Sequence, residues 1–488
     1  MDTLLLGSPP PATVELLRDA PWMDEAGRRT GSFDLLDQAT LGEIRLLIVG
    51  TAEGGPGGVR WFVPVLDAEP GRGAVGTAAF DRAVVTALRE GLRLPTHRGN
   101  LIEFHGRPPS YRDRLPFDPG WCSNAFSLLD LDGTAHAHKT YRRIGTGVRE
   151  PELLRLMADS GRTQQPVGDY TYLDAATGRR EPLGVLYRYA EGEGLNVPLR
   201  VGIRDLWTRT HSDGDPDSAV AESLRTLTEP LRAVGGFLRG FHQDLADRLG
   251  PHPEFPVAAC LAEAAEKLAG LTPLILADTR VPAAVREAAA DGLARELKRL
   301  SGLPSAEPWP VGPCHGDLHL SHVLRRELDD GTWELCVIDL STPVPDPDDP
   351  ATAQSPWQDL AALGRGLEIF TADEFSDHAA DRLGMDPEDT CRTALLQAAG
   401  VRPDTPGWTG PKLAELQRLR FAARGWAARA GTLLTGVGPG LAEHPAWRLF
   451  RLRRLIHELD YAYAHDRAYH AAINLRHAVE ASGLPAAR

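Results

Sequence analysis

The amino-acid sequence predicts a mixed α/β (α+β) protein of two lobes, in which a strand-rich N-terminal part precedes a mostly helical C-terminal part. Short β-prone runs separated by Gly- and Pro-rich turns occupy the chain as far as about Ala190. From there onward, apolar residues recur at the spacing of amphipathic helices. Between Val311 and Pro345 the helical pattern is interrupted by a polar cluster that lies next to a strand-like apolar run. We expect this interruption to be the chemical centre of the molecule.

The first predicted unit covers residues 1–118. Strands are expected at 45–49 and 59–65, because both runs are rich in β-prone residues and a Gly-rich turn lies between them. A helix is expected at 81–90, where apolar side chains fall on one side and charged ones on the other. We find no constellation of reactive side chains in this unit.

The second predicted unit covers residues 119–192. Its expected elements are a hairpin of strands 125–131 and 135–141 around Asp132-Gly133, a helix at 150–160, a strand at 182–189 and a polar hinge at 191–194. The Asp-Gly pair is a strong signal for a tight hairpin turn. A hairpin, a helix, a strand and a polar hinge in this order are typical of the small nucleotide-binding lobe of a kinase.

Lys139, on the second strand of the hairpin, is a candidate cation for the phosphates of ATP. The chain has 53 Lys and Arg residues but only four lysines, so a lysine within a strand is less easily explained as a casual surface charge. A helix glutamate usually holds such a lysine. Glu150 and Glu152 are both candidates, and we name Glu152 among the nucleotide-binding residues. The polar turn Ser123-Asn124 could offer N–H and hydroxyl groups to phosphate, although an ordinary turn explains it equally well.

The third predicted unit, residues 193–488, is mostly helical. Helices are expected at 222–249 with an interruption at Pro230, and at 258–271, 282–300, 412–434 and 447–480. Another helix opens at Ser355. Asp359, in its first turn, is expected to cap the helix or to hold the neighbouring segment rather than to react.

The polar cluster is the pentapeptide HGDLH at 315–319, and the apolar run 335–338 that follows it ends at Asp339. Two aspartates from neighbouring backbone segments suit phosphoryl transfer. Asp317 can orient a hydroxyl and take its proton, while Asp339 can hold a divalent metal ion on the phosphates of a nucleotide. The alternative is that both aspartates cap turns at strand ends.

Candidate substrate contacts are His315 and His319 of the polar cluster, and Glu458, Asp460 and Tyr461 of the last helix. Aromatic rings beside carboxylates suit the binding of a sugar by stacking and hydrogen bonding. An aromatic stripe that only packs the helix is equally consistent with this pattern.

The acidic, Pro-rich loop after Pro345 is a weaker candidate. Its carboxylates, Asp346, Asp348 and Asp349, could extend a metal site or favour a cationic substrate. The alternative is a solvated loop without a ligand.

The composition limits the class of protein. The chain has 488 residues, 42% of them hydrophobic and 25% charged, as in an ordinary globular protein of several domains. A net charge of −14 argues against general binding to nucleic acid or to an anionic membrane surface. The five cysteines are scattered and form no CxxC pair, and the N-terminus resembles no signal peptide. We therefore expect a cytoplasmic protein, and we expect it to be a monomer.

The motifs together resemble those of a known superfamily. The runs CHGDLHLSHVL, VIDL and SPWQDLAALGRGL resemble the aminoglycoside phosphotransferase superfamily, whose members share a protein-kinase-like fold. Within it, the sequence is most similar to actinobacterial maltokinases, which have glucosamine kinases as relatives. The similarity extends to SNAFSLL, LYRYAEGEG and ELDYAYAHDRAYH, and so covers roughly residues 121–488. The N-terminal unit is similar in kind to the cap subdomain of maltokinases.

This resemblance implies a two-lobed protein-kinase-like fold with an N-terminal cap subdomain and a helical C-terminal lobe. It also implies residue roles: Asp317 as the catalytic base, Asp339 and His322 as metal ligands, Lys139 as the cation on the ATP phosphates, and Tyr187, Tyr189 and Ala190 as the adenine hinge. The implied reaction is transfer of a phosphoryl group from ATP to maltose, giving maltose 1-phosphate, with Mg²⁺ as the metal.

Two positions depart from the family pattern. His322 places an imidazole where relatives have an amide, and nitrogen is a softer ligand that Mn²⁺ accepts better than Mg²⁺ does. The run 340–343 lacks the acidic residues that relatives have beside the metal. Two alternatives to a maltokinase therefore stay open, a kinase for an amino sugar such as glucosamine or for an aminoglycoside, and a non-catalytic, pseudokinase-like binding protein.

Overall fold

The computed structural model divides the chain into two compact units, residues 1–190 and 191–488. It describes residues 7–23, 25–29, 32–51, 59–118, 124–145, 147–210, 214–250, 252–302, 309–344, 346, 352–403 and 406–481. Among the described helices, none combines the length and the apolar character needed to cross a membrane.

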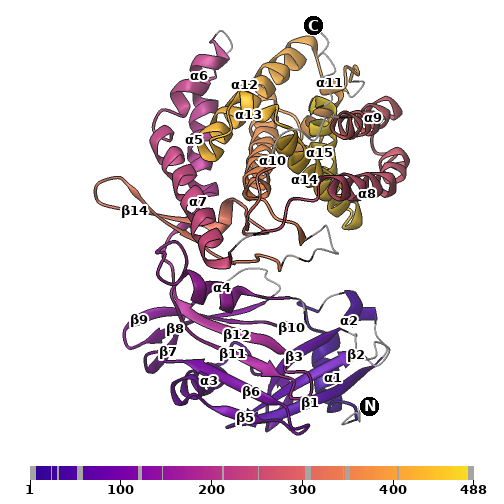
Figure 1. Ribbon diagram of the computed structural model, residues 1–488. Helices are drawn as coiled ribbons and strands as arrows, with labels where there is room; N and C mark the ends of the chain where they lie inside the picture. The colour runs from indigo at the N-terminus through magenta and orange to yellow at the C-terminus, as the bar shows by residue number, and fades with distance from the viewer. Residues whose placement is uncertain are drawn as a thin grey trace. The chain divides into compact units, whose positions relative to one another are not determined.

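The first unit contains two antiparallel sheets (Figure 1). The five-stranded sheet consists of β1 (Phe33–Leu41), β2 (Ile44–Thr51), β3 (Arg60–Leu66), β4 (Glu69–Gly73) and β10 (Arg143–Ile144). The seven-stranded sheet has the order β5 (Arg93–Pro95), β6 (Leu101–Gly106), β11 (Pro166–Leu173), β12 (Arg180–Arg188), β9 (Thr134–Thr140), β8 (Ala125–Leu131) and β7 (Tyr111–Leu115). Three short helices precede or connect these strands: α1 (Pro11–Arg18), α2 (Glu25–Arg29) and α4 (Glu150–Met157).

One hydrophobic core joins the two sheets through helix α3 (Ala78–Glu90). Phe62 from the five-stranded sheet, Phe80 and Leu88 from α3, and Phe104 and Tyr170 from the seven-stranded sheet all belong to it. The helix begins after Thr77, whose side chain accepts a hydrogen bond from the N–H of Phe80. The seven-stranded sheet takes strands from both sides of residue 118, where the sequence predicted a boundary between units; that boundary stays a prediction.

Several strands, a helix and a hairpin turn of the first unit lie where the sequence predicted them. The strands expected at 45–49 and 59–65 are β2 and β3, and the helix expected at 81–90 is most of α3. In the β8–β9 hairpin, Asp132 and Gly133 have φ angles of 51° and 86°, the positive values that a type I′ turn requires.

The second unit is mostly helical, as predicted, with α10 between α5–α7 on one side and α8 and α9 on the other (Figure 1). Its helices are α5 (Asn196–Arg209), α6 (Pro216–Ser223), α7 (Thr228–Leu249), α8 (Val257–Ala277), α9 (Ala283–Ser301), α10 (Pro356–Leu383), α11 (Pro387–Ala398), α12 (Gly410–Thr435), α13 (Pro439–Ala442), α14 (Pro445–Ala464) and α15 (Ala468–Ala481). The prediction of a mixed α/β protein with a strand-rich N-terminal part and a helical C-terminal part is confirmed.

Two predicted helices are divided in the structure. The helix expected at 222–249 is α7 alone, preceded by a turn and by α6, and Pro230 lies in its first turn, where the missing N–H is not needed. The helix expected at 447–480 is broken between α14 and α15, where Asp466 has a φ of 49°. A residue in this left-handed conformation ends a helix.

A small sheet lies in the helical unit and contains the segment with the polar cluster. It consists of β13 (Glu193–Gly194), β14 (Val323–Glu327) and β15 (Trp333–Val337), in that order and antiparallel. A single 3₁₀ turn, η2 (Leu320–His322), leads from the polar cluster into β14. The sheet therefore brings the segment before β14 close to the segment after β15.

Candidate active site

The loop at the polar cluster is held by the buried carboxylate of Asp359. Its Oδ2 accepts the N–H of His315 at 2.6 Å, and its Oδ1 accepts the N–H of Gly316 at 3.2 Å. The ring of His242, on α7, bonds to the same Oδ2 at 2.7 Å. Asp359 lies in the first turn of α10, whose start is fixed by a capping box of Ser355 and Gln358. Two helices therefore position the loop through one side chain.

His315 connects the segments that carry the two aspartates. Its Nε2 lies 2.9 Å from the carbonyl oxygen of Ile338, and its Nδ1 accepts the N–H of Asp317 at 3.2 Å. This pattern fits a neutral ring with its proton on Nε2. Burial lowers the pKa of His315, although the nearby Asp359 opposes the shift. His315, predicted as a substrate contact, is fully buried and instead ties the backbone of Asp317 to the residue before Asp339.

Asp339 has a left-handed backbone conformation, which is uncommon for residues other than glycine. Its φ is 62°, in the left-handed region, where an L-residue with a side chain is strained. The side chain is half-buried, and Asp317 is exposed. Strain of this kind persists where the surrounding structure enforces it, which is common at functional sites.

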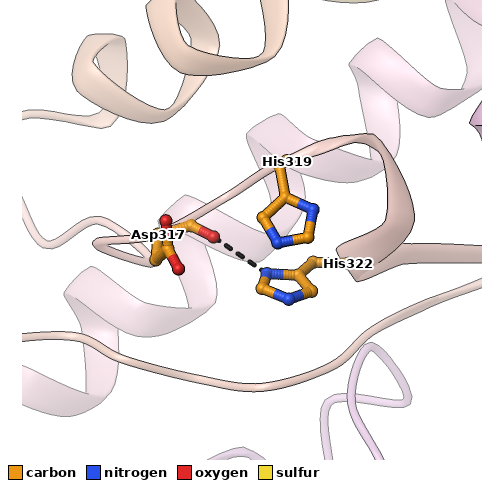
Figure 2. Close-up of side chains that lie close together, drawn as sticks. All are labelled: Asp317, His319 and His322. Atoms are coloured by element: carbon orange, nitrogen blue, oxygen red, sulfur yellow. Dashed lines mark hydrogen bonds between the residues drawn. The ribbon is translucent and has the colours of Figure 1, made fainter. Parts of the chain in front are cut away.

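His322 lies between the two aspartates. Its Nδ1 is 2.8 Å from the carbonyl oxygen of Asp317 (Figure 2), and its Nε2 is 3.5 Å from Oδ2 of Asp339. The ring of His319 packs against it with a centroid distance of 3.4 Å. Ligand atoms of Asp317, His319 and His322 all lie within 4.8 Å of one another.

These side chains form a donor set that fits a divalent ion. Because Nδ1 of His322 faces a carbonyl and must donate, its Nε2 is the atom with a lone pair for a metal, on the side of Asp339. Burial, followed by the influence of His322, lowers the pKa of His319 to about 4, so that ring also stays neutral. Two imidazoles beside carboxylates suit Mn²⁺ or a similar ion better than Mg²⁺, which prefers oxygen.

Lys139 forms its ion pair with Glu150 in the first unit. Its Nζ lies 2.6 Å from Oε2 of Glu150, and the two side chains are 2% and 3% exposed. The hydroxyl of Tyr141 donates to the same carboxylate oxygen at 2.7 Å. The prediction that Glu152 holds Lys139 was wrong, because Glu152 is half exposed and pairs with Arg149 at 2.8 Å. Glu152 lies two positions further along α4, on the side of the helix that faces away from the lysine.

The other predicted nucleotide-binding residues of this unit are only partly described. Tyr187, on β12, is buried, and its place in an adenine hinge stays a prediction. Tyr189 follows the strand, and its N–H donates to the carbonyl of Ala135 at 3.0 Å. Ala190 ends the unit. Asn124 lies directly before β8, and Ser123 is outside the described residues.

The candidate sugar contacts on α14 do not form one group. Glu458 is mostly buried and accepts hydrogen bonds from Arg365 at 2.9 Å and from Arg454 at 3.1 Å. Asp460 and Tyr461 are exposed, and the ring of Tyr461 packs against His465 at 4.1 Å. Of the acidic loop, only Asp346 is described; Asp348 and Asp349 lie outside the described residues.

Sequence reasoning missed the arginines that hold Glu458 in place. Arg365 is almost fully buried in α10 and contacts Glu368, Glu458 and Asn474. The available signal was a single charged residue within the apolar stripe of a helix, which indicates a buried ion pair.

Comparisons with known proteins show a structural likeness without a close sequence relative. No protein-family model and no curated protein matches the sequence. A glucosamine kinase matches with a TM-score of 0.54 at 18% identity, over 95% of this chain and 97% of its own. A glucosamine kinase in complex with glucosamine, ADP and inorganic phosphate matches with a TM-score of 0.51 at 18% identity, over 95% of this chain and 97% of its own. Another crystal form of glucosamine kinase matches with a TM-score of 0.52 at 18% identity, over 95% of this chain and 96% of its own. The chain therefore has the overall fold of glucosamine kinase.

Proposed function

We propose that this protein is an ATP-dependent phosphotransferase that phosphorylates a hydroxyl group of a sugar. The observation that carries the proposal is the arrangement around His315. Its buried ring connects the segments of Asp317 and Asp339, and both aspartate side chains remain accessible. An aspartate that only capped a turn would not need this buried support.

In this proposal Asp317 orients the acceptor hydroxyl and takes its proton as the oxygen attacks the γ-phosphate. The loop around Asp317 is rigid, because Asp359 and His315 bind its backbone, so little conformational freedom is lost when the acceptor binds. Asp339 and His322 would hold a divalent ion, which would neutralise charge on the phosphates. Lys139, fixed by Glu150, would contribute a further positive charge to the nucleotide.

Two sugars are candidate acceptors. Glucosamine is favoured by the structure in which a protein of this fold holds glucosamine, ADP and phosphate. Maltose is favoured by the sequence motifs that resemble maltokinases. A sugar with an amino group would carry a positive charge at neutral pH, and the exposed carboxylate of Asp460 is available to attract it.

The direct test measures release of ADP from ATP in the presence of glucosamine, maltose, glucose and an aminoglycoside, each with Mg²⁺ or Mn²⁺. We expect one sugar to stimulate release at least about 100-fold over water, since positioned acid–base groups contribute that much. Product analysis by NMR then identifies the phosphorylated hydroxyl. If ATP raises the melting temperature but no acceptor stimulates ADP release, the non-catalytic alternative is correct.

A further inference from the structure

A cavity inside the helical unit has no place in the proposed reaction. Its volume is about 550 Å³, within the size range of pockets that bind small molecules. Residues from α9, α10, α12, α14 and α15 line it, and none of them lies in the segment 309–344 that carries Asp317 and Asp339. Figure 1 shows these five helices within the second unit.

Small residues on the facing sides of two helices open this space. Gly364 and Ala372 of α10, and Ala423, Ala427 and Gly431 of α12, all line the cavity. On α12 they recur every four residues, so this face presents a short side chain at every turn, and on α10 they lie two turns apart with Glu368 between them. Larger residues in these positions would have filled the interior, as is normal in a protein core.

The charged side chains that line the cavity are mostly cationic. There are six arginines (Arg365, Arg420, Arg424, Arg448, Arg451 and Arg476) and three glutamates (Glu296, Glu368 and Glu480). Each glutamate pairs with arginines, for example Glu296 with Arg448 at 2.6 Å and Glu480 with Arg420 at 3.4 Å. Two further glutamates outside the lining pair with these arginines, Glu458 with Arg365 at 2.9 Å and Glu443 with Arg448 at 2.8 Å. The six arginines therefore face five glutamates, and a formal charge of one positive unit remains around the cavity.

Several of the innermost donors have no acceptor among the described residues. These are Nε of Arg420, Nε and Nη1 of Arg476, and Oγ1 of Thr371. The three residues are 2%, 4% and 2% exposed, respectively. Burial lowers the pKa of Arg420 although Glu480 opposes the shift, and the neighbouring Arg476 and Arg424 act in the same direction as burial. Glu480 gives Arg420 a counter-charge at 3.4 Å, whereas Arg476 has no ion-pair partner among the described residues. A buried guanidinium without a counter-charge is unfavourable, and water can satisfy its N–H groups but not its charge.

We propose that this cavity binds the phosphate group of a small molecule, as a site separate from the catalytic aspartates. Guanidinium groups offer paired N–H donors that match phosphate oxygens, and a phosphate supplies the counter-charge that Arg476 lacks among the described residues. Access is through the arginines at the rim, since Arg424 and Arg451 are 51% and 39% exposed. The inference does not depend on the proposed kinase activity.

The test uses isothermal titration calorimetry on the full chain with inorganic phosphate, a hexose 6-phosphate and the corresponding free hexose. We expect both phosphates to bind and the free hexose not to bind at this site. Equal affinity for inorganic phosphate and the hexose 6-phosphate would identify free phosphate as the ligand. Tighter binding of the hexose 6-phosphate would identify a phosphorylated sugar. Either result supports the site. Absence of heat with both phosphates would overturn the proposal.

Variants distinguish this cavity from the catalytic region. Arg476→Met and Arg420→Met should each weaken phosphate binding about tenfold or more, the effect of a lost charged hydrogen bond. Arg424→Gln changes a rim side chain that is 51% exposed and pairs with Glu480 at 3.5 Å. It should weaken binding, and it serves as the test if the buried substitutions unfold the protein. Arg429→Met, on the exposed side of α12, is the matched control and should change nothing. Asp339→Ala should also leave this binding unchanged. Phosphate binding that survives the cavity substitutions but is lost in Asp339→Ala would place the phosphate at the aspartates and refute the cavity site.

Discussion

At the scale of single residues, Asp317 is the most direct test of the proposed reaction. Asp317→Asn keeps the size of the side chain but removes the carboxylate that would accept the proton. We expect turnover to fall by about 10²- to 10⁴-fold, with the melting temperature unchanged because the side chain is exposed. Asp329→Asn, in the exposed turn between β14 and β15, is the matched control. Turnover of Asp317→Asn near that of the wild type would remove Asp317 from this role.

Asp339 combines a proposed metal ligand with a strained backbone, and two substitutions separate these properties. Asp339→Ala and Asp339→Gly both remove the carboxylate, so both should lose metal-dependent binding of ATP. They should differ in stability, because alanine at a φ of 62° is strained and glycine is not. We expect the glycine variant to be more stable than the alanine variant by about 1 kcal/mol in urea unfolding. Equal stability would mean that the backbone relaxes without the aspartate.

His322 should determine which metal ion the protein prefers. With its Nε2 3.5 Å from Oδ2 of Asp339, we expect Mn²⁺ to support turnover at least as well as Mg²⁺. His322→Gln replaces nitrogen with an amide oxygen and should shift the preference toward Mg²⁺. His319→Gln is informative beside it, because a changed preference there would place the ion among Asp317, His319 and His322 instead. The same metal preference in all three proteins would show that neither histidine is a ligand.

The sequence could predict that Asp317 and Asp339 come together, but not how the residues around them are used. The pentapeptide at 315–319 and the strand that ends near Asp339 predicted that the two aspartates come from neighbouring segments, as the structure has them. The sequence could not distinguish Glu150 from Glu152 as the partner of Lys139, because both precede the same apolar stripe and only the docking of α4 selects one. Nor could it show that His315 is buried, since that depends on Asp359 and His242, far along the chain.

At the scale of elements, hydrophobic periodicity predicted most of the long helices, and the local chemistry of turns and caps predicted where particular elements begin. The β8–β9 hairpin was predicted from its Asp-Gly turn, and α10 from its opening at Ser355. The strands β1, β6 and β11 were missed, although buried and partly buried residues alternate along β1. β6 and β11 lie inside the seven-stranded sheet, and their place there depends on pairing with distant strands, which no short window of sequence shows.

The docking of α15 should make stability dependent on pH through His477. Nη1 of Arg365 donates to Nδ1 of His477 at 3.0 Å. Burial, and then the arginines Arg365, Arg476, Arg451 and Arg424 of four different helices, hold the pKa of His477 well below its usual range. The ring therefore stays neutral in the folded protein, while the unfolded chain binds a proton below about pH 6.5.

The neutral ring of His477 therefore contributes to the free energy of unfolding in full above about pH 6.5, and this contribution is lost as the pH falls below that value. The loss should reach up to about 1.4 kcal/mol per pH unit, the value for one proton bound only by the unfolded chain. In urea unfolding at neutral and mildly acidic pH, His477→Gln should show a smaller pH dependence than the wild type. His470→Gln, exposed on the same helix, should behave like the wild type. Parallel pH profiles for wild type and His477→Gln would contradict the assignment.

At the scale of the whole molecule, the residues of the proposed reaction are divided between two units, each with its own interior. Lys139 and Glu150 belong to residues 1–190, and Asp317, His322 and Asp339 belong to residues 191–488. Each group is held by contacts within its own unit, such as Tyr141 with Glu150 and His315 with Asp317. The likeness to glucosamine kinase covers 95% of the chain and so includes both units. The proposed function accordingly requires that both units act on one nucleotide.

A double-mutant cycle tests this requirement. Lys139→Met and Asp339→Ala should each weaken the binding of ATP measured with a divalent ion. If both side chains act on the same phosphates, the double variant should lose less than the sum of the two effects, with a coupling of about 0.5 to 3 kcal/mol. Glu150→Gln, which keeps the lysine but removes its partner, replaces Lys139→Met if that variant does not fold. Lys267→Met, at an exposed ion pair of α8, is the control and should be additive with Asp339→Ala. Strict additivity for Lys139 and Asp339 would mean that the two residues act on different ligands, and it would count against a kinase that needs both units.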